Sequence, residues 1–396
     1  MNIGIDGRYI QDRYHGIGRY TFELLRQMVT NAPQHRYIVV HDPALANSRF
    51  DLRGLLMHPS VQAAPLRLRL YDPREQLHLR RLARRHALDV YHVPYFSAPL
   101  LLPCPVVLTI HDLILERFPA SLPQPWLRAT YRMLMLLGLR RARGVITVSA
   151  ATKSDLLAHY RIAAERVITI GEAADAAYRP LPDTAIAAVR RKYALPDQFV
   201  LAVGVRRPHK NIGALVRALG RISGQVPHAL VLVGGADHRF QDDVPSEAAR
   251  VGFTSRVRDL GVVAEEDLPA LYGAAAAYAC PSVIEGFGLP ILEALACGTP
   301  VVAGNMSSIP EITDQAAILC DPTDDVALAA ALLRVLTDSE LTARLRVAGI
   351  RQAATFSWPI AARATLGWYE SLVGTRTATS ITPAPLTTER GTTPGG

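Results

Sequence analysis

The chain has 396 residues, of which 49% are apolar and 20% are charged, and its 43 basic and 35 acidic residues give a formal net charge of +8. This length suits two domains, and the composition is ordinary for a soluble globular enzyme. No apolar run reaches the roughly 18 residues that a membrane span needs, so we expect no membrane-spanning helix. The positive charge favours an anionic partner, such as phosphate, a nucleotide or an acidic lipid, without choosing among them.

The N-terminal residues Met-Asn-Ile-Gly-Ile-Asp read as a buried strand and lack the plan of a signal peptide, so we expect the protein to work in the cytoplasm. The cysteines are far apart in apolar contexts, which argues against a disulfide framework and against metal-ligand spacing. We expect reduced thiols in the core at Cys104, Cys280, Cys297 and Cys320.

Short runs rich in Val and Ile alternate with longer helical patterns, which is typical of βαβ units and a parallel sheet. In the first half the strands are expected at residues 3–5, 37–41, 90–92, 106–110, 145–148 and 167–170. In the second half they are expected at residues 199–203, 230–233, 262–263, 277–279, 301–303 and 318–319. The pattern predicts an α/β protein with two doubly wound domains.

The proline-containing segment 178–183 suits a short, stiff connection between the two domains. We therefore predict an N-terminal domain over residues 1–178 and a C-terminal domain over residues 179–357. A helical pattern follows over residues 358–374. The remaining residues, 375–396, are rich in Thr, Pro and Gly and are expected to be disordered.

The most informative segment is 281–300, Pro-Ser-Val-Ile-Glu-Gly-Phe-Gly-Leu-Pro-Ile-Leu-Glu-Ala-Leu-Ala-Cys-Gly-Thr-Pro. Pro290 suits the first position of a helix, and Gly298 suits the residue just past its end. The free N–H groups of that helix, together with Gly286 and Gly288, favour a bound phosphate. The loop that would bind this phosphate also includes Phe287 and Leu289.

Two carboxylates frame this loop. Glu293, about one turn inside the helix, could accept hydrogen bonds from ribose hydroxyls, and Glu285, in the loop itself, could face a sugar. The whole string resembles the Glu-x7-Glu signature of retaining, nucleotide-sugar-dependent glycosyltransferases of family four. That resemblance implies the GT-B fold, in which two Rossmann-like domains face each other across a cleft, and a final helix that crosses back to the N-terminal domain.

Residues 201–212, Leu-Ala-Val-Gly-Val-Arg-Arg-Pro-His-Lys-Asn-Ile, lead from a strand through a basic loop into a helix. A phosphate there would meet a helix N-terminus and cationic side chains. The string resembles the family's second phosphate site, with Lys210 as the contact to the donor diphosphate. It departs from that pattern at His209 and Val205. Either Arg206 or Arg207 then supplies the second charge.

Residues 106–112, Val-Val-Leu-Thr-Ile-His-Asp, form a buried strand that ends in His111 at the edge where open α/β sheets bind ligands. This segment resembles the family's His-Asp-Leu motif, in which the histidine lies beside the donor sugar, while Asp112 orients the loop. Near the start, Tyr-His-Gly-Ile-Gly-Arg-Tyr at residues 14–20 is similar to the family's cleft-closing loop. This similarity assigns Gly16 and Gly18 to substrate contact, ahead of a helix expected over residues 21–28. Thr147-Val-Ser149 resembles another cleft-lining segment.

Basic and apolar residues alternate over 66–86, a pattern that fits either a surface lying on anionic lipid headgroups or an ordinary exposed helix face. If the first reading holds, the enzyme lies peripherally on the inner face of the cell membrane.

The resemblance implies transfer of a hexose from a nucleoside diphosphate to a hydroxyl of a glycan or lipid-linked glycan, with retention of the anomeric configuration. Glu285, His111 and Lys210 are the predicted catalytic residues, and no metal, cofactor or nucleic acid is expected. The favoured donor is GDP-mannose, because the motifs look most like those of bacterial polysaccharide mannosyltransferases; a UDP-hexose is the alternative. A sugar-nucleotide epimerase of the same fold and a silent glycan-binding partner are the other classes considered.

Overall fold

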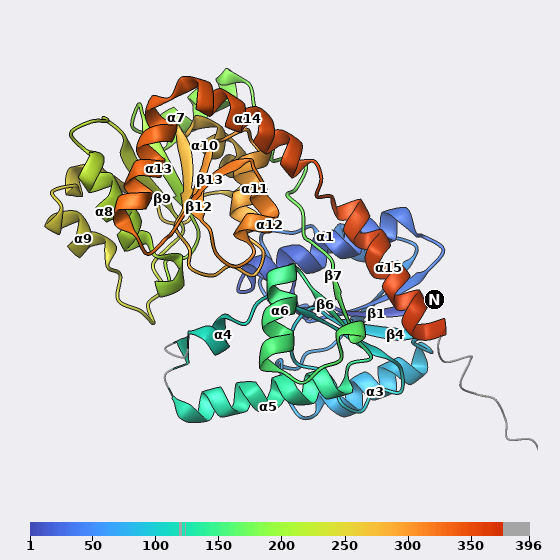
Figure 1. The fold of residues 1–396 in the computed structure, drawn as a ribbon. Helices are drawn as coiled ribbons and strands as arrows, with labels where there is room; N and C mark the ends of the chain where they lie inside the picture. Colours follow the sequence, from blue (N-terminus) through green and yellow to red (C-terminus); the bar gives the residue numbers. More distant parts are fainter. Residues whose placement is uncertain (119–120, 123, 375–396) are drawn as a thin grey trace, which may run out of the picture.

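The computed structural model describes residues 1–118, 121–122 and 124–374, which form two lobes, each built on one sheet (Figure 1). The segment predicted to be disordered, 375–396, lies outside the described residues. The α/β class with two doubly wound domains is confirmed, since every strand pairing in both sheets is parallel.

The N-terminal lobe contains a sheet with the strand order β3-β2-β1-β4-β5-β6-β7. Its strands are β1 (Asn2–Asp6), β2 (Arg36–His41), β3 (Val61–Pro65), β4 (Val90–Val93), β5 (Val106–Ile110), β6 (Gly144–Thr147) and β7 (Val167–Thr169). Its helices are α1 (His15–Asn31), α2 (Leu52–Leu56), α3 (Glu75–Arg85), α4 (Ile114–Arg117), α5 (Pro125–Arg141) and α6 (Ala150–His159).

Alternate residues of these strands face opposite sides of the sheet, as the twofold period of a strand requires. In β2, Val39 packs into the cluster that contains the buried residues of α1, whereas Ile38 and Val40 pack with those of α3, α5 and α6. Helices therefore cover both faces. Ligands of such sheets bind beyond the carboxyl ends of the strands, where the strand order reverses. Here the reversal lies between β1 and β4.

The C-terminal lobe has the strand order β10-β9-β8-β11-β12-β13, with its reversal between β8 and β11. Its strands are β8 (Phe199–Val203), β9 (Ala229–Val233), β10 (Val257–Asp259), β11 (Ala277–Cys280), β12 (Val301–Gly304) and β13 (Ala317–Cys320). Its helices are α7 (Asp183–Lys192), α8 (Ile212–Ile222), α9 (Val244–Arg250), α10 (Leu268–Ala274), α11 (Leu289–Ala296), α12 (Ile309–Thr313), α13 (Asp325–Thr337) and α14 (Ser339–Ala353).

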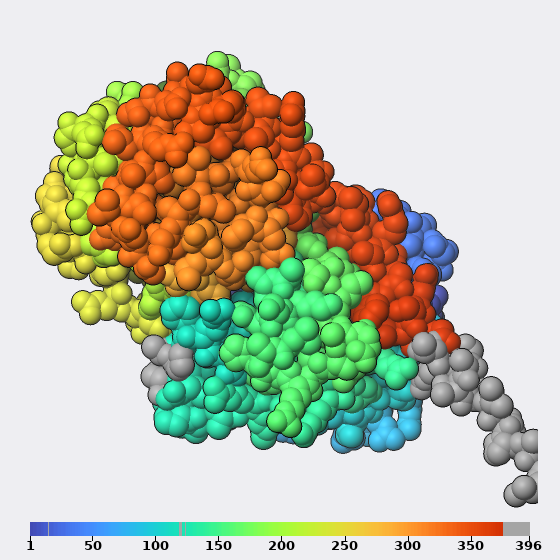
Figure 2. All heavy atoms as spheres, viewed as in Figure 1, coloured from blue at the N-terminus to red at the C-terminus, as the bar shows by residue number. Residues whose placement is uncertain are grey.

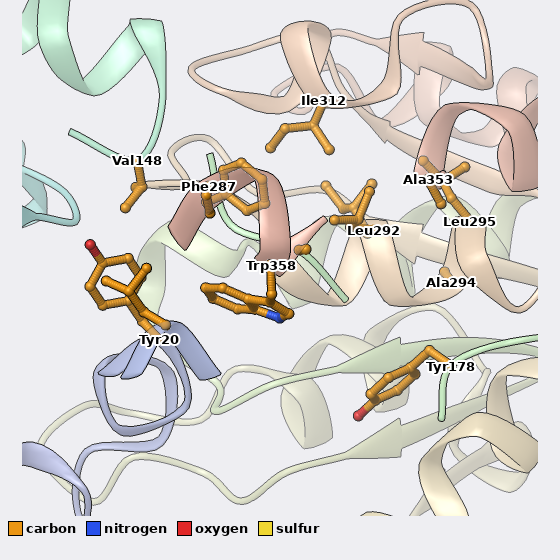
Figure 3. Packing of buried hydrophobic residues seen from close by; sticks show 14 of the residues in the cluster. Tyr20, Val148, Tyr178, Phe287, Leu292, Ala294, Leu295, Ile312, Ala353 and Trp358 are labelled. Carbon is orange, nitrogen blue, oxygen red and sulfur yellow. The ribbon is translucent and has the colours of Figure 1, made fainter. Parts of the chain in front are cut away.

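The last described helix, α15 (Trp358–Gly374), leaves the C-terminal lobe and packs along α1 of the other lobe. Its Tyr369 hydroxyl lies 2.6 Å from His92 Nδ1 in β4. Trp358, at the start of α15, lies beside Tyr20 of α1, with Phe287 of the C-terminal lobe close by (Figure 3). One apolar cluster thus extends through both lobes, and Figure 2 shows their atoms in contact along the boundary on the face in view.

Three local predictions were wrong. Strand β3 was missed, and β10 was placed at residues 262–263, where Val262 is in fact 83% exposed. Both are edge strands paired on one side, so their sequences, Val-Gln-Ala-Ala-Pro and Val-Arg-Asp, lack the apolar run of a central strand. The first helix was expected to begin at residue 21 and begins at His15.

Candidate active site

The loops at the strand-order reversal of the C-terminal lobe carry Lys210 and Glu285. Lys210 ends a short 3₁₀ turn, Pro208–Lys210, in the connection from β8 to α8, and Glu285 lies in the connection from β11 to α11. The Lys210 ammonium donates to both carboxylate oxygens of Glu285, at 2.7 and 2.9 Å. The structure thus brings together two predicted catalytic residues that are 75 positions apart in the sequence.

Each member of this pair stabilises the charged form of the other. Burial opposes the ammonium of Lys210, but the neighbouring Glu285 carboxylate raises the pKa of Lys210 above its ordinary value. Burial likewise opposes the Glu285 carboxylate, but Lys210 lowers the pKa of Glu285 below its ordinary value. Both groups are therefore charged near neutrality, and the site holds a fixed cation where a phosphate could bind.

His111 belongs to the N-terminal lobe and lies directly after β5, at the junction where the two lobes meet. Its Nδ1 is 3.1 Å from Glu172 Oε1, and its Nε2 is 3.1 Å from the Pro94 carbonyl oxygen. A carbonyl oxygen can only accept, so this contact assigns a proton to Nε2. The Tyr20 ring meets the imidazole edge-on, with ring centroids 4.8 Å apart. The ring of His111 is therefore fixed in orientation.

Asp112, the next residue, orients the start of the following helix. Its Oδ1 accepts a hydrogen bond of 2.9 Å from the backbone N–H of Ile114, in line with the predicted orienting role. Burial raises the pKa of the Asp112 carboxyl, and the charge of Glu285 raises it further. Asp112 and Glu285 therefore lie near enough to influence each other across the boundary between the lobes.

At Gly286 the backbones of the two lobes come close together. A Cβ atom at this position would lie 2.2 Å from the His111 carbonyl oxygen, so any larger residue would force the lobes apart. The Gly286 carbonyl oxygen accepts hydrogen bonds from the hydroxyls of Ser149, at 2.6 Å, and Thr152, at 3.2 Å. Ser149 belongs to the segment that the sequence marked as cleft-lining. Gly286 thus has a packing role in addition to the predicted phosphate contact.

The two candidate arginines differ in their surroundings. Arg206 donates to Asp242, at 3.0 and 3.1 Å, and to Asp259, at 2.7 Å, so its charge is balanced by carboxylates of its own lobe. Arg207 donates to Asp237, at 3.0 Å, which Arg239 also engages.

The charge of Arg207 also acts on the active-site groups around it. Arg207 opposes the raised pKa of Lys210 and the raised pKa of Asp112. Burial lowers the pKa of His209 to about 4, with Lys210 and Arg207 adding to the effect. His209, which stands where the family pattern has arginine, is therefore neutral and buried.

The loop before α11 has the backbone geometry that phosphate binding needs. Gly288 caps the helix with φ +107°, Leu289 is its first residue, and Pro290 is its second, one position later than predicted. Gly298 has φ +71°, which confirms the predicted left-handed end of the helix. The Phe287 side chain lies in the apolar cluster between the lobes (Figure 3), and its carbonyl oxygen accepts from the Ser308 hydroxyl at 2.7 Å, so a donor contact at this residue would use its backbone N–H.

Gly16 and Gly18 lie in the first turn of α1 rather than in a loop before it. A Cβ at Gly16 would meet nothing within 4 Å, whereas one at Gly18 would lie 3.0 Å from the Tyr9 carbonyl oxygen. The N-cap residue, Tyr14, makes no side-chain cap. The N–H groups of this first turn therefore receive no cap from the Tyr14 side chain, as a helix start that binds an anion requires.

Glu293 is buried and bonded on both oxygens. Its Oε1 accepts a hydrogen bond of 2.5 Å from Arg19, and its Oε2 accepts one of 2.9 Å from the Tyr272 hydroxyl. Arg19 belongs to the N-terminal lobe and also pairs with Glu265 of the C-terminal lobe. The predicted ribose carboxylate is thus covered by a cation from across the junction.

Sequence reasoning missed Arg19, Glu172 and Tyr272. Arg19 stood within the quoted Gly-Ile-Gly-Arg-Tyr string, so its place beside the two glycines was a signal that went unused. Glu172 and Tyr272 lie in segments without a motif, and only the fold brings them to His111 and Glu293. Across residues 1–118, 121–122 and 124–374, no cluster of three or more His, Cys, Asp or Glu side chains is arranged to hold a metal ion.

Comparison with known families places both halves of the chain. Residues 14–178 match Glycosyltransferase Family 4, and residues 186–352 match Glycosyl transferases group 1. The O-antigen chain mannosyltransferase B of Escherichia coli is 31% identical over 372 residues, which cover 90% of this chain and 96% of the relative. The chain belongs to the group 1 glycosyltransferases.

Other relatives agree with this assignment. The serotype-specific mannosyltransferase WbdA of Escherichia coli is 27% identical over 90% of this glycosyltransferase, which spans 46% of that longer relative. Among solved structures, HepE of Anabaena in complex with UDP and glucose superposes with a TM-score of 0.71 at 22% identity, covering 93% of this chain and 99% of HepE.

A second solved structure, the sucrose-phosphate synthase of Thermosynechococcus elongatus, superposes with a TM-score of 0.73 at 22% identity, covering 95% of this chain and all of that protein. At this level of identity the likeness establishes the shared GT-B fold.

Proposed function

We propose that this glycosyltransferase moves a mannosyl residue from GDP-mannose to a hydroxyl of a growing glycan and retains the anomeric configuration. The observation that carries the proposal is the Lys210–Glu285 pair, which lies at the strand-order reversal of one lobe, beside Gly286, where the backbone approaches that of His111 in the other lobe. The mannosyltransferase relatives support mannose as the sugar. A UDP-hexose remains the alternative donor.

In the proposed reaction, the bond between the sugar C1 and the β-phosphate oxygen breaks and a bond from C1 to the acceptor oxygen forms on the same face. The acceptor proton passes to the departing phosphate. Negative charge grows on the diphosphate as it leaves, so preorganised donors aimed at it lower the barrier. Lys210, Arg207 and the free N–H groups before α11 are the groups that we assign to this charge.

Arg207 is assigned to the diphosphate in preference to Arg206. The charge of Arg206 is balanced by two carboxylates, whereas Arg207 shares Asp237 with Arg239 and keeps a surplus of positive charge near Lys210. Half-exposure of Arg207 leaves it room to turn toward a ligand.

Glu285 is assigned to a hydroxyl of the transferred sugar, and His111 to a position beside that sugar. Both Glu285 oxygens already accept from Lys210, which supports a binding role over attack on C1. Glu293 is assigned to the ribose. Glu172, which fixes His111 through Nδ1, is a positioning residue for the same reaction. We assign no metal or cofactor to these steps.

The reaction can be tested directly by incubating the protein with separate radiolabelled GDP- and UDP-sugars, with and without a mannan acceptor, and measuring consumption and products. The proposal predicts acceptor-dependent consumption of GDP-mannose. Acceptor-dependent consumption of a UDP-hexose instead would overturn the donor assignment. A changed sugar nucleotide without transfer would identify an epimerase, and binding without turnover would identify a silent partner.

We further propose that the N-terminal lobe lies peripherally on the inner face of the cell membrane, so that a lipid-linked acceptor can reach the cleft. Across the described part of the chain, the structure contains no helix long and apolar enough to span a bilayer. Leu100 lies in the loop between β4 and β5. Its backbone N–H donates to the Gln76 side chain of α3, and its carbonyl oxygen accepts from Arg141 at the end of α5. The N-terminal lobe carries exposed basic residues on α3 and exposed Trp126, Met133 and Leu136 on α5.

Each basic residue near an anionic surface contributes about 1 kcal/mol, screened over roughly 8–10 Å, so this binding should be weak and salt-sensitive. Changing Arg80, Arg81, Arg84 and Arg85 to Gln should reduce co-sedimentation with anionic liposomes at low salt. The matched control changes four exposed arginines of the other lobe, Arg250, Arg258, Arg344 and Arg351. Equal loss in both variants, or no loss in the first, would mean that α3 is only a solvated helix face.

A further inference from the structure

Arg19 connects the two lobes at the carboxylate that we assign to the ribose. It lies in the first turns of α1, it is buried, and its guanidinium reaches Glu293 at 2.5 Å and Glu265 through a second ion pair. The Tyr178 hydroxyl accepts from it at 3.3 Å, and the Tyr178 ring lies 5.7 Å from its guanidinium carbon.

A ribose that approached the buried Glu293 would compete with the donors already bound to its two oxygens, Arg19 and Tyr272. Tyr272 belongs to the same lobe as Glu293 and is fully buried, so it is a fixed donor. Arg19 comes from the other lobe, and its second partner, Glu265, is 32% exposed at the edge of the junction. Arg19 is therefore the donor that can withdraw without breaking up the C-terminal lobe.

A guanidinium and a ribose diol offer a carboxylate similar hydrogen bonds. Arg19 donates one N–H, from Nη1, to Glu293 Oε1, while its Nη2 faces Glu265, and a ribose hydroxyl likewise offers an O–H donor to a carboxylate oxygen. The guanidinium and the ribose therefore compete for the same Glu293 oxygen. The guanidinium carries a charge, so its hydrogen bonds to Glu293 are the stronger ones that a ribose must replace.

We propose that Arg19 is a placeholder for the ribose of the donor, and this proposal rests on the ribose role assigned to Glu293. It binds Glu293 while the donor site is empty and withdraws to Glu265 when a nucleoside diphosphate binds. After transfer, its return to Glu293 displaces the ribose and speeds release of the nucleotide product. Arg19 is thus a positioning residue that adjusts nucleotide affinity.

Charge balance around Glu265 explains why a nucleoside diphosphate is suited to this exchange. Arg49 also donates to Glu265, at 2.7 and 2.8 Å, so Glu265 serves two arginines. When Arg19 leaves Glu293, it keeps Glu265 as its carboxylate partner and shares it with Arg49. The diphosphate that arrives with the ribose brings compensating negative charge.

A purely structural ion pair predicts a different response to substitution. If Arg19 only ties the lobes together, removing it should lower thermal stability and leave nucleotide affinity unchanged or weaker. If Arg19 is a placeholder, removing it frees Glu293 and should tighten nucleotide binding. The two readings therefore differ in the sign of one measurable change.

The experiment is calorimetric titration of the full chain with GDP and with 2′,3′-dideoxy-GDP, and likewise with the UDP pair. The variants are Arg19→Gln, Glu293→Gln and the double variant, with Arg26→Gln as a control on the same helix, where the half-exposed Arg26 pairs with Glu23 of its own lobe. Arg19→Gln should bind GDP about tenfold more tightly, equivalent to about 1.4 kcal/mol. It should bind the dideoxy form like the parent, and the double variant should show no gain.

In steady state, Arg19→Gln should lower KM and, because nucleotide release slows, also lower kcat. Arg19→Lys, which keeps the charge but offers no fork, should lie between parent and Arg19→Gln and provides the test if Arg19→Gln unfolds. Unchanged or weaker GDP binding in both folded variants would overturn the placeholder role. If the parent itself binds GDP and its dideoxy form equally, the ribose assignment of Glu293 fails instead, and the placeholder role fails with it.

Discussion

Replacing Lys210 with Met removes the cation that we assign to the departing diphosphate. A charge-assisted contact of this kind is worth about 1.5–3 kcal/mol, so kcat/KM should fall by about one to two decades. Because negative charge grows on the leaving group, the loss should affect kcat as well as KM. Initial rates with radiolabelled GDP-mannose over a range of concentrations measure both parameters.

The same substitution leaves Glu285 without its partner. Removing one member of a buried ion pair costs about 3–5 kcal/mol, and the 21% exposure of the Lys210 side chain should reduce this to about 2–3 kcal/mol. The double variant Lys210→Met/Glu285→Gln removes both charges and should regain most of this stability in urea titrations. It should not regain activity.

The stability of the pair also depends on pH. Burial opposes both charges, but Lys210 lowers the pKa of Glu285 below 4.5 and Glu285 raises the pKa of Lys210 above 10.5. The stabilisation is therefore complete between about pH 4.5 and 10.5. It is lost as pH falls through the lowered pKa of Glu285 or rises through the raised pKa of Lys210.

Lys192→Met is the matched control, because Lys192 is exposed and pairs with Asp267 rather than with an active-site carboxylate. Its kcat/KM should equal that of the parent. The reasoning is refuted if Lys210→Met, folded as judged by circular dichroism, keeps the parent's kcat/KM. It is also refuted if the double variant recovers activity together with stability.

Three further predictions concern neighbouring residues. Arg207→Gln should lower kcat/KM by about tenfold with little loss of stability, whereas Arg206→Gln should mainly lower the melting temperature; the reverse outcome would exchange their roles. Glu293→Gln should weaken binding of free GDP in calorimetry, whereas Glu285→Gln should mainly lower kcat, and parent-like binding by both would exclude the ribose contact. Gly286→Ala should cost about 1–3 kcal/mol of stability and lower kcat, because its Cβ would lie 2.2 Å from a backbone oxygen; an unchanged melting temperature would show that the lobes separate freely.

The central strands of both sheets could be predicted because burial on both faces leaves continuous Val- and Ile-rich runs, as in Val-Val-Leu-Thr-Ile of β5. The edge strands β3 and β10 were missed because their sequences are short and partly polar, as in Val-Arg-Asp of β10, whereas the edge strands β7 and β13 were predicted from their apolar residues. The start of α1 was not predicted because the two glycines in its first turn have low helix propensity and are more typical of a loop. Packing of α1 against the sheet outweighs that low propensity.

Positions in the candidate site were predictable where a motif fixed them, as for Lys210 and Glu285. Their direct contact was not, because it depends on two loops meeting at the strand-order reversal. The choice between Arg206 and Arg207 likewise needed the carboxylates around each side chain. Arg19 covering Glu293 is a contact between lobes, which no local pattern encodes.

The most direct test of the proposed donor site is a crystal structure of this glycosyltransferase with GDP-mannose or its non-transferable 2-fluoro analogue. The account predicts the β-phosphate within hydrogen-bond distance of Lys210 Nζ, the hexose beside Glu285 and His111, and the ribose hydroxyls on Glu293 with Arg19 withdrawn. A nucleotide bound away from the Lys210–Glu285 pair, with that pair undisturbed, would contradict it.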